Sequence, residues 1–305
     1  MDLERRFATD EACREYLFQL RWPEGFVCPR CTGGPAWPAS RGRLICCECR
    51  HQTSAIAGTI FQDTRTPLTL WFRAVWYVTS QKNGASAASV QRVLGLRSYQ
   101  TAWTWMHKLR RAMVRPGRDP LQGTVEVDET FVGGEDPKDG TWVEQKALVV
   151  IAAEEDGAGI GRIRLATARS ATRRSLHRFV KDAIAPGSLV HTDGRTAYEG
   201  LEAFGYKHRQ TVLLGHKDQG AAGKLLPRVH RVASLLKRWL LGTHQGAVRR
   251  EHLDYYLDEF TFRFNRRTSR SRGKLFFRLL QQAVELPPVT YLQMIGGNAT
   301  DNKPQ

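Results

Sequence analysis

Apolar and polar residues alternate along residues 124–130, which predicts a β-strand. The alternation separates the side chains into two faces: Val125, Val127 and Glu129 on one, and Glu126, Asp128 and Thr130 on the other. A carboxylate in the middle of a strand is unfavourable to bury unless it has a partner. A metal ion is the natural partner for Asp128, and the plainer alternative is a structural cap.

Further segments extend this pattern into a mixed α/β unit. Residues 146–153 and 162–166 predict two more strands, which should form an antiparallel meander with the first. Residues 171–184 predict a helix, and residues 188–194 predict a buried strand that ends in an acid and a glycine. Three strands, a helix and a fourth strand in this order are typical of the ribonuclease H-like core. The expected fold class is therefore α/β and ribonuclease H-like.

Asp128 and Asp193 lie on predicted neighbouring strands. An Asp at the carboxyl end of a buried strand opens onto the crevice where ligands bind in such sheets. Two such carboxylates suit two divalent ions about 4 Å apart, one activating an attacking oxygen and one stabilising the leaving oxygen. Mg²⁺ fits hard oxygen ligands and phosphate substrates. The alternative for Asp193 is an ordinary turn residue.

Three helices are predicted before this unit. The apolar run 68–78 follows Pro67 and predicts the core helix of a small bundle. Residues 86–94 and 99–114 predict two more helices, joined by a glycine-containing turn. This arrangement matches a helix-turn-helix, with a plain helical hairpin as the alternative. The start of the second helix would then face DNA bases, through Tyr99, Gln100, Thr101 and Thr104.

The last predicted helices are strongly basic. Residues 228–280 contain 13 Lys and Arg against four acids. Their apolar residues follow helical spacing and belong to a core, so the arginines should face outward. A solvated basic face is one interpretation, but the densest run favours a track for a DNA backbone: Arg263, Arg266 and Arg267.

These patterns divide the chain into four predicted segments. They are a cysteine-rich segment (residues 1–66), a helical DNA-binding region (67–118), the ribonuclease H-like unit (121–285) and a polar tail (286–305). The stretch 115–120 has two prolines and a glycine, which is typical of an interdomain linker.

The net charge of +16 narrows the class of partner. A surplus of this size indicates a polyanionic partner, because neutralising phosphates releases counterions. Its spread along the whole chain favours nucleic acid over a ribosomal or membrane-surface role. No run of 18 apolar residues is present, and the first residues lack the apolar core of a signal peptide. We therefore expect a cytoplasmic protein associated with the bacterial nucleoid, with no membrane partner.

Two pairs of cysteines predict a structural zinc site. Cys28 and Cys31 form one CxxC motif, Cys46 and Cys49 form another, and 14 residues separate the two. Each short turn presents two sulfurs to one ion, and two such turns complete a tetrahedron in a zinc ribbon. Cys47 or His51 could replace one ligand, and redox thiols are the alternative for the whole set. Cys13 lies outside the pattern and is expected to be a buried thiol.

Four ordered motifs resemble those of a known family. They are Val125-Glu126-Val127-Asp128-Glu129-Thr130, His191-Thr192-Asp193-Gly194, residues 230–246 and residues 256–267. The chain resembles the zinc-ribbon, DDE-type insertion-sequence transposases of the family numbered 1595. The resemblance covers roughly residues 10–285. It implies that Asp128 and Asp193 are the first two catalytic carboxylates.

The third family motif departs from the pattern in this chain. The family has an acidic residue on a helix and a Lys or Arg seven residues later, so that both lie on one face. Here His230 occupies the acidic position and Lys237 the basic one. His230 could ligate a metal, which favours Mn²⁺ over Mg²⁺ somewhat. It could instead position the phosphate while Glu129 or water completes the metal shell, lie in solvent on the helix surface, or mark a decayed copy.

The function implied is metal-dependent cleavage at transposon ends, followed by strand transfer into target DNA. Expected cofactors are two Mg²⁺ or Mn²⁺ ions at Asp128, Asp193 and His230, and one structural Zn²⁺. Lys237 would hold a DNA phosphate. The partners are terminal inverted repeats, target DNA and at least one further copy of the chain. A ribonuclease H-like nuclease and a non-catalytic DNA-binding regulator are the rival interpretations.

Overall fold

The structure is a computed structural model that describes residues 3–114, 117–133, 146–211, 225–246 and 248–296. The chain separates into two compact units. Unit 1 contains the described residues up to 114 together with 269–296, and unit 2 contains the described residues from 117 to 268. The change from the first unit to the second falls inside the predicted linker 115–120.

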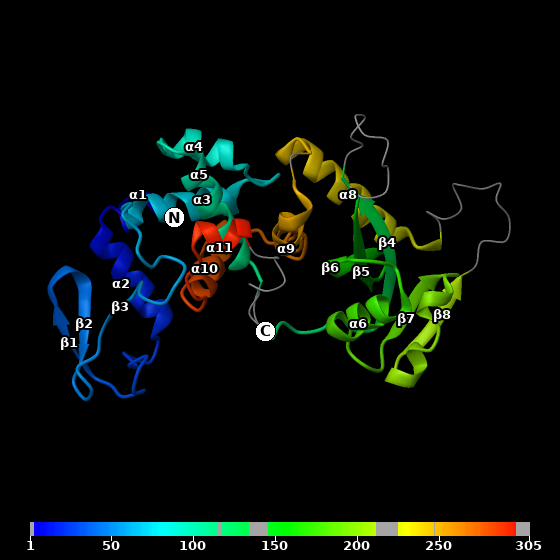
Figure 1. Cartoon of the computed structure of the whole chain (residues 1–305), viewed down its shortest axis with the longest axis horizontal. Helices are drawn as coiled ribbons and strands as arrows, with labels where there is room; N and C mark the ends of the chain where they lie inside the picture. The colour runs from blue at the N-terminus through cyan, green and yellow to red at the C-terminus, as the bar shows by residue number, and fades with distance from the viewer. Residues whose placement is uncertain (1–2, 115–116, 134–145, 212–224, 247, 297–305) are drawn as a thin grey trace. The chain divides into compact units, whose positions relative to one another are not determined.

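Unit 2 is built on a five-stranded sheet. Its strands are β4 (Thr124–Val132), β5 (Ala147–Asp156), β6 (Gly159–Ala168), β7 (Leu189–Asp193) and β8 (Lys207–Thr211). The strand order is β6-β5-β4-β7-β8 (Figure 1). The first three strands pair antiparallel, whereas β7 pairs parallel to β4 and β8 parallel to β7. This is the ribonuclease H-like arrangement that the sequence predicted, with β8 as an additional strand.

The pairing of β4 with β7 brings the two predicted carboxylates to one level of the sheet. Thr124 pairs with Leu189, and Glu126 pairs with His191. Asp128 and Asp193 each follow the last of these pairs by two residues, and the Asp193 charge acts on Asp128. The crossover between β4 and β7 therefore unites residues that lie 65 positions apart in the sequence.

Helices cover both faces of the sheet in unit 2. On one face, α8 (Pro227–His244) and α9 (Leu253–Phe264) pack over alternate apolar side chains of β5 and β6. On the other face, α6 (Arg173–Ala183) packs over Val125, Val127 and their neighbours. Short 3-10 turns complete the unit: η2 (Thr196–Tyr198), η3 (Leu201–Phe204) and η4 (Arg250–His252). The central strands of the sheet are thus covered on both sides, and their polar residues need partners inside the unit.

The N-terminal part of unit 1 holds a small three-stranded sheet. After α1 (Leu3–Arg6) and α2 (Asp10–Arg21), the chain forms β1 (Ala36–Ala39), the turn η1 (Ser40–Gly42), β2 (Arg43–Cys46) and β3 (Gln52–Ser54). The three strands are antiparallel in the order β1-β2-β3. Cys28 and Cys31 precede this sheet, and Cys46 and Cys49 lie at the connection from β2 to β3, as the zinc-ribbon interpretation requires.

Three helices follow the ribbon in the sequence. They are α3 (Leu68–Ser80), α4 (Ala87–Leu94) and α5 (Tyr99–Arg111). The Ser86 side chain accepts a hydrogen bond from Ser89 N and caps the start of α4, while Gly95 ends α4 at φ +64°. Only the four residues from Gly95 to Ser98 separate α4 from α5, and the two helices pack together. The predicted pair of helices is therefore present, with α5 ending before residue 114.

The C-terminal residues differ from the predicted boundaries. Helix α10 (Arg272–Ala283), placed with the ribonuclease H-like unit on sequence, lies in unit 1. Its Phe276 ring contacts Phe7 and Phe72 at 5.8 and 5.7 Å between centroids. The apolar face of the helix therefore completes the core of unit 1. The arginine-rich sequence around α10 gave no indication that this helix packs into unit 1.

The predicted polar tail also contains structure. Helix α11 (Tyr291–Gly296) lies within it, and Leu286, Val289 and Met294 are buried. The described part of the tail, residues 286–296, is thus part of the unit 1 core; the rest of the tail lies outside the described residues. Across the ranges that the structure describes, no helix has the length and apolar content needed to span a membrane.

Candidate active site and zinc centre

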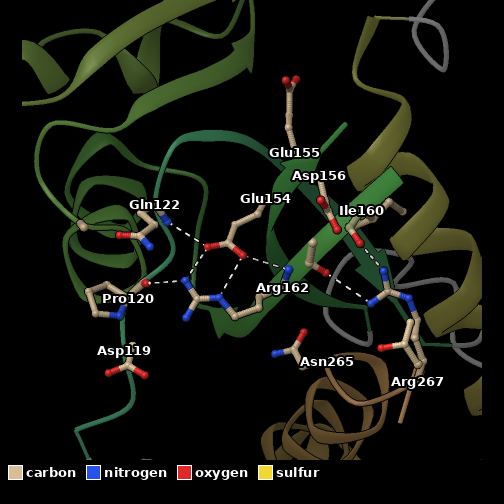
Figure 2. Close-up of a pocket in the computed structure, with 13 residues that line it drawn as sticks. Asp119, Pro120, Gln122, Glu154, Glu155, Asp156, Ile160, Arg162, Asn265 and Arg267 are labelled. Atoms are coloured by element: carbon tan, nitrogen blue, oxygen red, sulfur yellow. Dashed lines mark hydrogen bonds and ion pairs between the residues drawn. The ribbon is translucent and has the colours of Figure 1, made fainter. Parts of the chain in front are cut away.

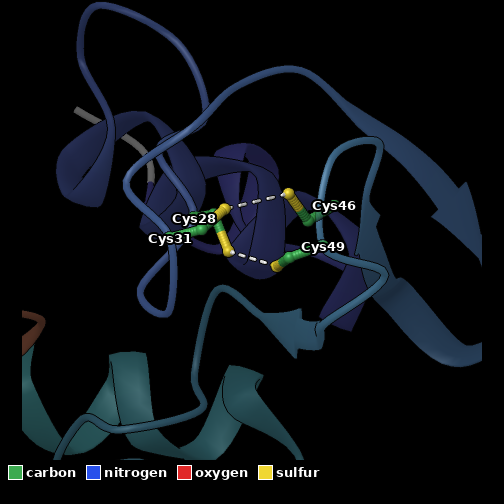
Figure 3. Close-up of side chains that lie close together, drawn as sticks. All are labelled: Cys28, Cys31, Cys46 and Cys49. Atoms are coloured by element: carbon green, nitrogen blue, oxygen red, sulfur yellow. Dashed lines mark hydrogen bonds between the residues drawn. The ribbon is translucent and has the colours of Figure 1, made fainter.

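Four cysteine sulfurs converge beside the small sheet of unit 1 (Figure 3). Cys28 Sγ lies 3.6 Å from Cys49 Sγ, and Cys31 Sγ lies 3.6 Å from Cys46 Sγ. All four sulfurs lie within 4.8 Å of one another. A tetrahedral zinc ion with Zn–S bonds of about 2.3 Å separates its sulfur ligands by about 3.8 Å. The spacing therefore fits one Zn²⁺ held by the four predicted ligands.

The other cysteines and His51 are not part of this cluster. Cys47 follows Cys46 directly, and its backbone N–H donates to the Pro35 carbonyl. Cys13 is fully buried on α2, and burial followed by the nearby Asp10 carboxylate raises the pKa of its thiol to about 12. Cys13 is thus a neutral packing residue, as expected from its place outside the motifs.

Asp128 is the central residue of the candidate active site in unit 2. Its side chain is 19% exposed and points to the face of the sheet that α8 covers. Burial raises the pKa of Asp128, and the nearby Asp193 carboxylate raises it further. The Glu129 N–H, at 2.8 Å from Asp128 Oδ1, and the charges of His230 and Arg195 oppose this rise. A divalent cation would relieve the same repulsion more fully.

His230 reaches the site from the first turns of α8. Its Nε2 atom lies 3.8 Å from Asp128 Oδ2. The two residues line a hollow of about 150 Å³, closed by residues of β4, β5 and α8: Glu129, Thr130, Ile151, Val229 and Ala233. Lys237 is exposed two turns further along α8. The third predicted position thus lies next to the first, as the family spacing implies.

The three predicted metal ligands do not converge on a single point. Within the described residues, the cysteine cluster is the one group of three or more potential ligand atoms that all lie within 4.8 Å of one another. Asp128 instead has His230 at 3.8 Å from one carboxylate oxygen and Asp193 close enough for its charge to act on it. This layout suits ions that each take two protein ligands and leave positions for water and phosphate oxygens.

Three residues beside the carboxylates were not singled out from the sequence as a group. Glu129, with a side chain 4% exposed, accepts a hydrogen bond from Tyr198 Oη at 2.7 Å. Its second oxygen lies 3.4 Å from Arg195 Nε. Burial raises the pKa of Glu129, and Asp128 and Asp193 add to the rise. The only sequence signal was their proximity to the two aspartates.

Glu126 anchors the helix that carries His230. Its buried carboxylate accepts hydrogen bonds from the backbone N–H groups of Arg228 and Val229, at 2.8 and 3.0 Å. Arg228 Nη1 lies 2.9 Å from Glu126 and 3.0 Å from Glu155. A carboxylate at a helix N-terminus is favourable because it meets unpaired N–H groups. Glu126 therefore fixes the start of α8 two residues before His230.

Replacing Glu126 with glutamine should lower the free energy of unfolding by about 3 kcal/mol, because it removes one charge from a buried ion pair. The Glu155→Gln control affects the same guanidinium from a carboxylate that is 30% exposed. Its expected cost is below about 1 kcal/mol. Urea unfolding of the full chain measures both. Equal losses of unfolding free energy in the two variants would contradict the role of Glu126 in anchoring α8.

The predicted base-reading residues lie at the accessible start of α5. Tyr99 is 53% exposed and Gln100 is exposed, whereas Thr101 and Thr104 are half-buried. Thr104 Oγ1 donates to the Gln100 carbonyl within the helix. The four side chains can thus meet a ligand from one end of the helix. Their contact with DNA stays a prediction.

The predicted arginine track has intramolecular partners in the structure. Arg263 forms an ion pair at 2.9 Å with Glu259, which is fully buried, and its own side chain is only 13% exposed. Arg267 donates to the Ile160 and Gly161 carbonyls at the edge of a hollow of about 660 Å³ (Figure 2). Arg266 lies over the Phe262 ring at 4.2 Å. These contacts favour a structural role for Arg263 and Arg267, because their donors already have acceptors.

Comparisons with known proteins connect both parts of the chain to one group. A transposase zinc-ribbon domain matches residues 8–52, and an ISXO2-like transposase domain matches residues 120–265. Both are described for insertion sequences of the IS1595 type, and together they cover more than half of the chain. A relative from Halobacterium salinarum, an uncharacterized protein in transposable element ISH50, is 27% identical over 290 residues, which is 88% of this chain and 95% of the relative.

Two solved structures are similar at low sequence identity. The simian T-cell lymphotropic virus intasome, in complex with the PP2A regulatory subunit B56 gamma, matches at 12% identity, with 76% of this chain and 77% of that chain covered and a TM-score of 0.33. The Mos1 transposase paired-end complex with the left transposon end matches at 12% identity, with 76% and 79% covered and a TM-score of 0.30. The assignment rests on the two family matches: this chain belongs to the IS1595 family of insertion-sequence transposases.

Proposed function

We propose that the chain cleaves DNA at transposon ends and joins the freed ends to target DNA, with Asp128, Asp193 and His230 as the catalytic metal ligands. One observation carries this proposal above all. Asp128 lies level with Asp193 on adjacent parallel strands and 3.8 Å from His230 on α8. A regulator without chemistry has no use for two adjacent acids, one of them largely buried.

The donor set fits divalent cations. Carboxylate oxygens are hard ligands that suit Mg²⁺ or Mn²⁺, and the imidazole of His230 favours Mn²⁺ somewhat. Two bound ions would activate the attacking oxygen and stabilise the leaving oxygen of an in-line displacement. Asp128, Asp193 and His230 would hold these ions, since both other residues lie near Asp128.

The reaction needs two displacements at phosphorus. In the first, a water oxygen attacks the phosphate at the transposon end, and the P–O3′ bond breaks to leave a 3′ hydroxyl. In the second, that hydroxyl attacks a target phosphate, and the target O3′ leaves. Lys237, exposed two turns after His230, would hold a phosphate next to the reacting one. No covalent bond between protein and DNA is required.

DNA recognition is assigned to unit 1. The start of α5 presents exposed polar side chains in helix-turn-helix geometry, which suits a major groove. The zinc ribbon, which precedes these helices in the sequence, contains additional arginines. Two transposon ends have to be held together for joining, so we expect at least a dimer on DNA.

A strand-transfer assay tests this function. The full chain is incubated with DNA carrying the element's ends, with target plasmid and with Mg²⁺ or Mn²⁺. We expect 3′ end cleavage and joined products, both abolished by EDTA. Cleavage without joining would support the ribonuclease H-like nuclease instead. End binding without cleavage in either metal would support the regulator.

The same assay determines the role of His230. We expect His230→Ala to slow cleavage about 100-fold, because it removes a ligand beside Asp128. His230→Glu should restore activity and shift the metal preference from Mn²⁺ toward Mg²⁺. Ser234→Ala, one turn along the exposed side of α8, is the control and should match wild type. An unchanged rate in His230→Ala would remove this residue from the site.

A further inference from the structure

Glu129 is a buried acid with no evident task in metal binding. It lies beside Asp128 in sequence, and its side chain points to the opposite face of β4. Both of its oxygens have protein partners, Tyr198 Oη at 2.7 Å and Arg195 Nε at 3.4 Å. A third carboxylate close to two others is unfavourable on electrostatic grounds. The burial of Glu129 is explained if its carboxylate holds the positively charged side chain beside it in place.

Arg195 is that cation, and it stands at the rim of the candidate active site. It follows Asp193 by two residues, and its backbone N–H donates to Asp193 Oδ1 at 3.1 Å. Its side chain is 48% exposed. The positive charge is close enough to favour the ionised form of Asp128. The Arg195 backbone thus contacts Asp193, while its side chain lies beside Glu129 and remains half-exposed to solvent.

The orientation of Arg195 leaves one edge of its guanidinium toward a ligand. Nε is the guanidinium nitrogen in the 3.4 Å ion pair with Glu129, and within the described residues neither Nη1 nor Nη2 has a hydrogen-bond acceptor. The outer edge of a guanidinium carries two parallel N–H donors, which match two oxygens of a phosphate. A lysine in this place would supply charge without that paired geometry.

Tyr198 makes the arrangement rigid. Its side chain is fully buried in the core between the sheet and α6, and its hydroxyl donates to Glu129. The short turn η2 brings Tyr198 back to the sheet three residues after Arg195. Tyr198 fixes Glu129, and Glu129 fixes Arg195. A donor that is already oriented stabilises developing charge more effectively than one that must reorganise.

We propose that Arg195 is a further catalytic residue, which contacts the non-bridging oxygens of the scissile phosphate, and that Glu129 and Tyr198 are positioning residues for it. This inference rests on the proposed function. Phosphoryl transfer concentrates negative charge on the equatorial oxygens, and the protein's main contribution is positioning and electrostatic stabilisation. The simpler alternative is that Arg195 only neutralises Glu129.

Single-turnover cleavage with saturating DNA separates these interpretations. We expect Arg195→Ala to lower the cleavage rate constant about 100-fold. Affinity for DNA ends and the binding of Mn²⁺ without DNA should both stay within about threefold of wild type. Arg195→Lys should recover only part of the rate, since a point charge lacks the paired donors. Arg173→Ala is the matched control, because Arg173 forms a 3.4 Å ion pair with Glu199 in the same unit.

The double variant Glu129→Gln with Arg195→Ala gives the decisive result. If Arg195 only neutralises Glu129, removing both charges restores the wild-type rate, and the proposal is overturned. Under the proposal the double variant stays as slow as Arg195→Ala. A wild-type rate in Arg195→Ala alone, with wild-type cleavage intact, overturns this inference and leaves the proposed function standing. Absence of metal-dependent cleavage in the wild type overturns both.

Discussion

Asparagine in place of Asp128 is expected to reduce end cleavage and strand joining by at least about 10³-fold in either metal. Asparagine keeps the shape of the side chain but removes the charge that holds a divalent ion. Asp128 has both other predicted ligands as neighbours. Asp193→Asn should have a comparable effect, because the β4–β7 register sets it beside Asp128.

Quantitative gel analysis of cleaved and joined DNA measures this loss, and circular dichroism checks that the fold is retained. Asp182→Asn is the matched control, because Asp182 lies on the exposed side of α6 in a surface ion pair with Arg178. It should leave the rate unchanged. Joining at the wild-type rate in either active-site variant would refute the assignment of these carboxylates.

Loss of the zinc site should have the second large effect, on the folding of the ribbon and on the binding of transposon ends. Serine in place of Cys46 breaks the four-sulfur cluster, and a structural zinc site contributes on the order of 10 kcal/mol to folding. The ribbon sheet is small and has few other buried residues to hold it together. We expect the variant to lose its bound zinc, its protease resistance around residues 28–49 and its binding to transposon ends.

Cys47→Ser provides the matched control, since it changes the neighbouring cysteine outside the cluster. It should retain one zinc per chain by elemental analysis and bind ends normally. Binding of Mn²⁺ at the unit 2 site should persist in both variants, because that unit has its own core. Full zinc content in Cys46→Ser would show that another residue completes the centre.

The sequence predicted strands β4 to β7 well because their pattern of apolar and polar residues is local. Alternation along β4 separated Val125 and Val127 from Glu126 and Asp128, and the structure buries these pairs on opposite faces. Strand β8 escaped notice because its residues, Lys207–Thr211, are polar and mostly exposed. Without an apolar face, an edge strand of this kind gives no periodic signal.

Other features depended on contacts between distant residues. Glu126 pairs with Arg228, which lies 102 positions away in the sequence, and no local sequence pattern predicts that pairing. The arginine-rich run predicted a single DNA track, yet the structure gives Arg263 a buried acid and Arg267 backbone carbonyls. Charge in a sequence indicates a class of partner, whereas the partner of each side chain is decided by the packing around it.

The position of Phe276 ties the folding of unit 1 to the order of protein synthesis. Phe7 and Phe72 emerge from the ribosome early, but the helix that covers them, α10, is among the last segments made. Domains generally fold as units as their residues become available. Unit 1 is therefore completed only after the residues of unit 2 have been synthesised. A chain that ends before α10 lacks Phe276 and leaves Phe7 and Phe72 without the ring that covers them.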